Sequence, residues 1–147
     1  MRKLLLMGLL MAGACTSRTI AVPETSATQG PRPALAEFLA SVRSQDLQAM
    51  SGAWGDKDGA VRDSKKMSRQ EMEQRELLLM CYFRHDSYRV LGDSPGPEGE
   101  RILSVELTKG TLKRTTNFFL TKGGDRWYVR SAEIEPVRDL CSDRKRE

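Results

Sequence analysis

The sequence predicts an α+β domain, in which three helices pack on a curved antiparallel sheet of about four strands. Three runs near the end of the chain alternate apolar with polar residues as half-buried strands do, namely 101–108, 115–121 and 126–134. Glycines between these runs provide the positive φ that hairpin turns require. The segments before them carry apolar residues at helical spacing, and such helices can cover the apolar face of the sheet.

The first two helices are expected between Pro33 and Gly55. Proline suits the first turn of a helix, and Ser44 or Asp46 can cap the second helix, which Gly55 ends. The apolar positions of the first helix, spaced i, i+3, i+4 and i+7, are Leu35, Phe38, Leu39 and Val42. Trp54 continues the apolar spacing of the second helix; we expect it to pack in the core, and a ligand platform is the functional alternative.

A third helix is predicted from Arg69 to about Tyr82, because Ser68 and Glu71 form a capping box at its start. Residues 77–83 are apolar nearly all round, so we expect this half of the helix to be buried between the sheet and the first two helices. A hydrophobic binding groove is the alternative for the same residues.

Two further segments are expected to be loops. Residues 55–66 are charged and loop-like, and Asp56 opens a stretch that faintly resembles a calcium loop. The twelfth position of that stretch is Met67, where a calcium loop has a bidentate glutamate, so calcium is excluded. After the third helix, residues 87–92 are expected to form a further strand, and the prolines and glycines of residues 93–99 prevent its continuation.

The N-terminus is the most specific pattern in the chain. Arg2 and Lys3 precede an apolar run, residues 4–11, that is too short to span a bilayer, and small residues then lead to Cys15. This pattern resembles a bacterial lipoprotein signal, which implies that residues 1–14 are a signal peptide and that Cys15 is acylated. There are two alternatives: cleavage by ordinary signal peptidase, or an unmodified cysteine in an uncleaved helix.

The lipoprotein resemblance implies a protein of the bacterial cell envelope, which acyl chains hold on the lipid bilayer. Thr16 follows the cysteine, and the lack of an aspartate there favours the outer membrane, with the domain facing the periplasm. Residues 15–33 are rich in Ser, Thr, Pro and Gly and are expected to form the lipidated N-terminus and a flexible tether. The folded domain is then expected over residues 34–141, followed by a charged tail, residues 142–147.

The charge pattern gives little support to nucleic-acid binding. The chain has 24 basic and 20 acidic residues, a net charge of +4, and removal of Arg2 and Lys3 with the signal peptide brings it closer to balance. The charges are interspersed, and no basic face with interleaved aromatic residues is visible. The basic run 144–146 is interpreted as a solvated terminus.

Two cysteines remain once Cys15 is assigned to the lipid, and an even pair in an oxidising compartment favours a disulfide. Cys81 lies near the end of the third helix and Cys141 just beyond the last strand, so a bridge would join the C-terminal tail to that helix. Closure of this loop of about sixty residues contributes roughly 4 kcal/mol in the chain-entropy model. Two buried thiols are the alternative, and the absence of a Cys-x-x-Cys motif argues against redox activity.

Three helices followed by an antiparallel meander resemble the nuclear transport factor 2-like fold. The match covers residues 34–141, and residues 38–50 are similar to the opening helix pair of that family. The family includes ketosteroid isomerase, polyketide cyclases, dehydratases and many non-catalytic binding domains, so the fold alone does not name a function. The resemblance implies a cone-shaped cavity between helices and sheet, and the aromatic residues assigned to its wall are Trp54, Tyr82, Tyr88, Phe118 and Trp127.

The catalytic candidates follow from the isomerase-type enzymes of that family, which use a cavity carboxylate as base and a tyrosine or a protonated acid as oxyanion donor. Strand alternation places Glu133 on the same face as Trp127, at a strand end where a solvated rim is the simpler expectation. His85 beside Asp86 is the second candidate; a surface turn pair is its simpler explanation. Tyr82 or Tyr88 would then be the donor.

The sequence therefore supports two hypotheses about function. The first is a non-catalytic, membrane-tethered domain that binds a small apolar ligand or an envelope partner. The second is a cavity isomerase, cyclase or hydratase that uses Glu133 or His85. We expect no cofactor and, with a single histidine, no metal site. No Gly-x-Ser-x-Gly elbow supports a nucleophilic serine, and a homodimer through the outer face of the sheet is a third arrangement.

Overall fold

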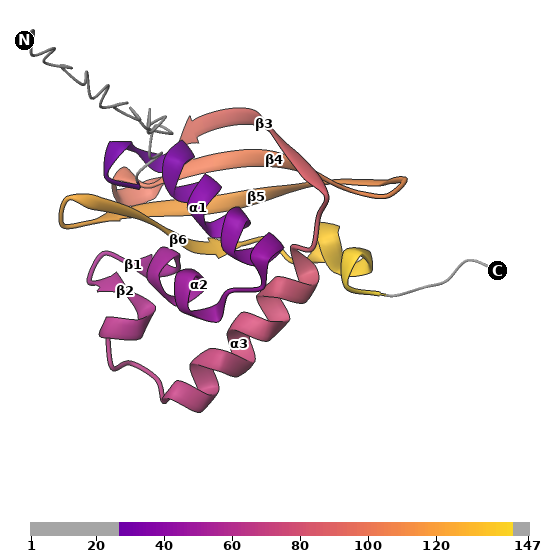
Figure 1. The fold of residues 1–147 in the computed structure, drawn as a ribbon. Helices are drawn as coiled ribbons and strands as arrows, with labels where there is room; N and C mark the ends of the chain where they lie inside the picture. The colour runs from indigo at the N-terminus through magenta and orange to yellow at the C-terminus, as the bar shows by residue number, and fades with distance from the viewer. Residues whose placement is uncertain (1–26, 143–147) are drawn as a thin grey trace, which may run out of the picture.

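A meander of antiparallel strands in the order β3-β4-β5-β6 forms the main sheet (Figure 1). The computed structural model describes residues 27–142. The strands are β3 (Ser87–Pro95), β4 (Arg101–Lys109), β5 (Leu112–Gly123) and β6 (Arg126–Ala132). The α+β class and the antiparallel sheet predicted from the sequence are confirmed.

Side chains on one face of this sheet form part of the core of the domain. In the β4–β5 register Leu103 lies opposite Phe118 and Val105 opposite Thr116, and all four residues are buried. Alternation along each strand turns their neighbours to the other face, where side chains are partly exposed. The apolar alternation of residues 101–108 and 115–121 therefore marked the buried face correctly.

The helices are α1 (Pro31–Ser44), α2 (Leu47–Ala53) and α3 (Arg69–Tyr82). The predicted caps are present: Asp46 accepts a hydrogen bond from the backbone N–H of Ala49 at 3.0 Å, and Ser68 accepts one from Glu71 at 3.2 Å. The Glu71 carboxylate accepts a hydrogen bond from Arg75 at 2.7 Å, so the cap consists of the hydrogen bond that the Ser68 hydroxyl accepts from the Glu71 N–H. α1 lies across one face of the sheet and contacts β5 and β6 (Figure 1).

The expectation that residues 55–66 form a loop is wrong. Strands β1 (Gly55–Asp56) and β2 (Gly59–Ala60) pair as a small hairpin, and the 3-10 helix η2 (Val61–Asp63) follows. Gly59 has φ +116°, a conformation that favours glycine. Gly55 leaves no room for a side chain, because an added Cβ would lie 2.8 Å from the ring of Tyr128.

The strand after α3 also extends further than expected. β3 continues through Pro95, whose pairing partner is Arg101. A proline is tolerated here because β3 is an edge strand, so the missing N–H leaves no gap in the sheet. The 3-10 helix η3 (Pro97–Gly99) then turns the chain into β4, and a bulge at Leu91 separates the two halves of the β3–β4 register.

The expectation that the second half of α3 is buried all round is wrong. Leu77 and Leu78 are 57% and 56% exposed, whereas Met80 and Phe83 on the opposite side are buried. α3 packs against the rest of the domain through one side, and no described segment covers its other side. A continuous run of apolar residues therefore forms a helix segment that is exposed on one side.

Two short 3-10 helices lie at the ends of the described chain. η1 (Ala27–Gln29) and the first turn of α1 belong to residues 15–33, which the sequence assigned to the tether, and Ala27 is buried. η4 (Glu135–Cys141) follows β6 and packs against α3 and β5. The predicted signal peptide, the acylation at Cys15 and the charged tail after Ser142 lie outside the described residues.

Candidate functional site

A small apolar pocket lies between the helices and the end of β6, with a volume of about 170 Å³. α3 contributes Leu79, and Phe83 follows directly after that helix. The complete lining is Phe38, Trp54, Leu79, Phe83, Val129, Arg130, Ser131, Ala132 and Ile134. None of these side chains is a carboxylate or an imidazole, so the pocket offers apolar contact and no acid or base.

Trp54 forms part of this wall because the end of α2 is tied to β6. Trp54 has an extended backbone as the C-cap of α2 and makes a β-bridge with Val129. Its carbonyl accepts a hydrogen bond from the N–H of Val61 at 2.9 Å, which fixes the hairpin that follows. The indole ring is half-buried against the core. It therefore packs against the core, as expected, and its ring also forms part of the pocket wall; the role of ligand platform stays a prediction.

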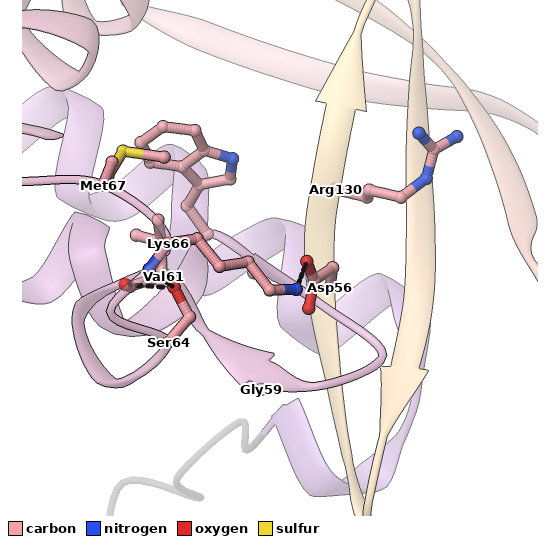
Figure 2. A pocket seen from close by; sticks show the side chains of 9 residues that line it. Asp56, Gly59, Val61, Ser64, Lys66, Met67 and Arg130 are labelled. Carbon is pink, nitrogen blue, oxygen red and sulfur yellow. Dashed lines mark hydrogen bonds and ion pairs between the residues drawn. The ribbon is translucent and has the colours of Figure 1, made fainter. Parts of the chain in front are cut away.

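A second pocket of about 190 Å³ also includes Trp54 and lies beside the β1–β2 hairpin (Figure 2). Lys66 reaches toward Asp56, and its ammonium group donates to Asp56 at 2.7 Å and to Asp58 at 2.6 Å. The hydrogen bond from Lys66 lowers the pKa of the Asp56 carboxyl below its ordinary value. Arg130 points away from this pocket (Figure 2) and pairs with Glu100. The charges at this pocket are thus already compensated.

The concave side of the sheet is filled with side chains. Phe118 packs against Phe83 with ring centroids 5.0 Å apart and against Phe38 at 6.1 Å, and all three rings are almost completely buried. Phe118 is therefore a core residue, and its assignment to a cavity wall is wrong. The volume that a cone-shaped cavity would need is occupied by these rings.

The other predicted wall residues are dispersed. Tyr88 is 37% exposed and touches the ring of His85, at 5.8 Å between centroids. Trp127 lines an open polar groove with Lys122 and Glu100, and Tyr82 is partly buried against the core from α3. Among the predicted wall residues, only Trp54 lines the apolar pocket beside α3.

Glu133 does not face the core. In the β5–β6 register Leu120 pairs with Val129 but Phe119 pairs with Ser131, so Arg130 is an extra residue in β6. Such a bulge reverses the alternation of all residues after it. Glu133 is consequently exposed, and its carboxylate accepts a hydrogen bond from Asn117 at 3.2 Å. The inward orientation inferred from uninterrupted alternation is wrong.

His85 is buried, contrary to the surface turn that the sequence favoured. Its Nδ1 lies 2.8 Å from the carbonyl oxygen of Phe83, and its Nε2 has no hydrogen-bond partner among the described residues. Burial lowers the pKa of the ring, which favours the neutral form. His85 is not among the residues that line the two pockets beside Trp54, so the geometry does not bring it to a substrate site.

Glu76 is a buried acid that the sequence analysis missed. Its exposed fraction is 1%, and neither carboxylate oxygen has a hydrogen-bond partner among the described residues. Burial, with a smaller contribution from Glu73, raises the pKa of Glu76 to about 7. The sequence contained a pattern that could have predicted this burial, because Glu76 occupies the helical position that continues the buried series Met80 and Phe83.

Cys81 and Cys141 form a disulfide, with Cα atoms 4.7 Å apart. The bond ties the last turn of α3 to the end of η4, as the sequence predicted for this pair. Among residues 27–142 no group of three His, Cys, Asp or Glu side chains is arranged to hold a metal ion.

No family model, curated protein or solved structure matches this chain. The resemblance to the nuclear transport factor 2-like fold therefore stays a prediction. No helix within residues 27–142 has the length and hydropathy needed to cross a membrane.

Proposed function

We propose that this chain is a lipid-anchored protein of the bacterial cell envelope, whose α+β domain binds a partner protein without catalysis. The anchor rests on the charge and hydropathy pattern that ends at Cys15. A disulfide between Cys81 and Cys141 suits an oxidising compartment such as the periplasm. As to the finer fold, helices followed by a four-stranded meander support a nuclear transport factor 2-like arrangement with a filled cone.

The size and lining of the apolar pocket carry the binding proposal. Sites for drug-sized ligands usually occupy about 300–1,000 Å³. The pocket beside Leu79 has about 170 Å³ and presents no carboxylate or imidazole. This space suits one apolar side chain or a single ring, and it is smaller than the usual site for a drug-sized ligand. Neither Glu133 nor His85 lines this pocket, so the enzyme alternative gains no support from it.

Exposed leucines favour a protein as the source of that apolar group. Leu77 and Leu78 are more than half exposed on α3, the helix that also contributes Leu79 to the pocket. Exposed apolar side chains of this kind are typical of protein interfaces. A small free ligand would leave these two leucines in water.

Photo-crosslinking in intact cells tests the binding proposal. A photoreactive phenylalanine derivative at Leu79 should give a discrete adduct, whereas the same group at the exposed Ala40 of α1 should not. Ala132→Leu places added carbon in the pocket and should abolish the adduct without unfolding the domain. An adduct that survives Ala132→Leu, or equal labelling from Ala40, would contradict binding through this pocket.

Fractionation tests the anchor separately. Cys15→Ser should move the protein from the membrane fraction to the soluble fraction, because the acyl chains provide the membrane affinity. The intact mass of the membrane-extracted wild type should include acyl groups on a chain that begins at Cys15. An unmodified cysteine, or a serine variant that stays bound to membranes, refutes the anchor and leaves the pocket proposal untouched.

A further inference from the structure

The first half of α3 contains a buried acid, Glu76. Of the helix residues only Glu76 and Met80 are buried, and Met80 lies next to the disulfide-bonded Cys81. The second half is therefore fixed covalently, whereas the first half depends on Glu76 and on partly buried neighbours such as Met72. α3 as a whole packs against η4, α2, α1 and η2.

The surroundings of Glu76 favour a neutral carboxyl group. Its side chain is buried with both oxygens unpartnered, and an ionised carboxylate in that position lacks the hydrogen bonds that water would provide. α2 carries no charged side chain, and Glu73 adds repulsion from the same helix. Among the described residues no cation lowers the pKa of Glu76.

The charged groups on the elements packed against α3 each have a partner or an interaction other than Glu76. They are Arg32, Glu37 and Arg43 on α1, Asp46 at the cap of α2, Arg62 and Asp63 on η2, and Glu135, Arg138 and Asp139 on η4. Their partners in ion pairs or caps are Asp93 for Arg32, Arg126 for Glu37, the N–H of Ala49 for Asp46, Asp63 for Arg62, Glu135 for Arg138, and Arg114 for Asp139. Arg43 is exposed and acts on His85.

We propose that Glu76 is a proton-dependent latch, whose neutral carboxyl holds the first half of α3 against α2 and η2 and whose ionised form releases it about a hinge at Cys81. The latch goes beyond the proposed function and does not depend on what the pocket binds.

Hydrogen exchange of the full chain in detergent micelles tests the latch. Opening returns Glu76 to water, where its carboxyl has the ordinary pKa. Between the pKa of the open state and that of the closed state, the equilibrium constant for opening therefore rises by up to about tenfold for each pH unit. The protection factors of amides 73–77, corrected for intrinsic exchange, should therefore fall about 40-fold between pH 5 and pH 7, because the slope flattens as pH approaches either pKa. Amides 80–82, next to the disulfide, should keep their protection.

Two variants separate the latch from general loosening. Glu76→Gln removes the ionisation and should leave protection nearly independent of pH, whereas the matched Glu73→Gln removes only the smaller cause of the raised pKa and should keep a clear fall in protection with rising pH. An equal fall in Glu76→Gln, or an equal loss of protection at amides 80–82, overturns the proposal. In the wild type, the carbon-13 signal of the Glu76 carboxyl should titrate with a midpoint of about 7, and a midpoint at 4.5 overturns it independently of any variant.

Discussion

Replacement of Glu76 by glutamine should stabilise the domain at neutral and alkaline pH but not at acid pH. The folded protein keeps the Glu76 proton up to a pKa of about 7, whereas the unfolded chain releases it at the ordinary value of 4.5. The folded state therefore binds more protons between these values, and the free energy of unfolding of the wild type falls as pH rises through this window. At about 1.4 kcal/mol for each pH unit, the whole window corresponds to roughly 3 kcal/mol.

Glutamine stays neutral throughout, so the variant avoids this loss. Urea denaturation of oxidised protein, followed by circular dichroism, should show the variant gaining roughly 3 kcal/mol on the wild type between pH 4 and pH 8. The comparison between the two pH values cancels the cost of the buried amide itself. Glu73→Gln is the control and should change by a few tenths of a kcal/mol, as expected for an exposed i,i+4 pair. A constant difference between Glu76→Gln and the wild type at all pH values would refute a buried, proton-binding carboxyl.

Three further changes test the packing, each followed by the free energy of unfolding in urea. Cys141→Ser opens a loop with a sequence separation of 60 residues and should cost about 4 kcal/mol; an unchanged midpoint would contradict a structural disulfide. Phe118→Ala should cost about 3–5 kcal/mol because its ring is fully buried, and Phe119→Ala on the other face should cost clearly less; equal costs would contradict the assignment of faces. Gly55→Ala should destabilise the β1–β2 hairpin, since the new Cβ would lie 2.8 Å from a tyrosine ring, whereas at Gly92 the nearest atom is 3.8 Å away and alanine should be tolerated.

Local patterns in the sequence were sufficient for the elements that depend on local physics. The alternation of Leu103, Val105 and Leu107 defined a half-buried strand, because successive side chains of any strand point to opposite faces. Asp46 and Ser68 marked helix starts, because their side chains reach the free N–H groups of their own first turn. The disulfide pair followed from cysteine number and the compartment that the N-terminus implied.

The orientation of Glu133 could not be read from local pattern. One extra residue in β6, Arg130, reverses the alternation, and the bulge exists only relative to the partner strand β5. Tertiary packing likewise decided that Leu77 and Leu78 are exposed while Glu76, in the same helix, is buried. Which side of a helix meets the domain depends on the neighbours it packs against, and a run with apolar residues on every side does not specify that side.

The candidate site is one of the features that tertiary packing decides. The sequence placed Trp54 at the end of a helix, but its position in the pocket wall depends on a bridge to Val129, which is 75 residues away along the chain. Phe38, Phe83 and Phe118 come from three separate elements, and only their mutual packing fills the space in which the resemblance implied a cavity. Periodicity and capping act over a few residues and can be seen in one dimension, whereas pocket volume and the ionisation of a buried acid depend on atoms that meet only when the chain is folded.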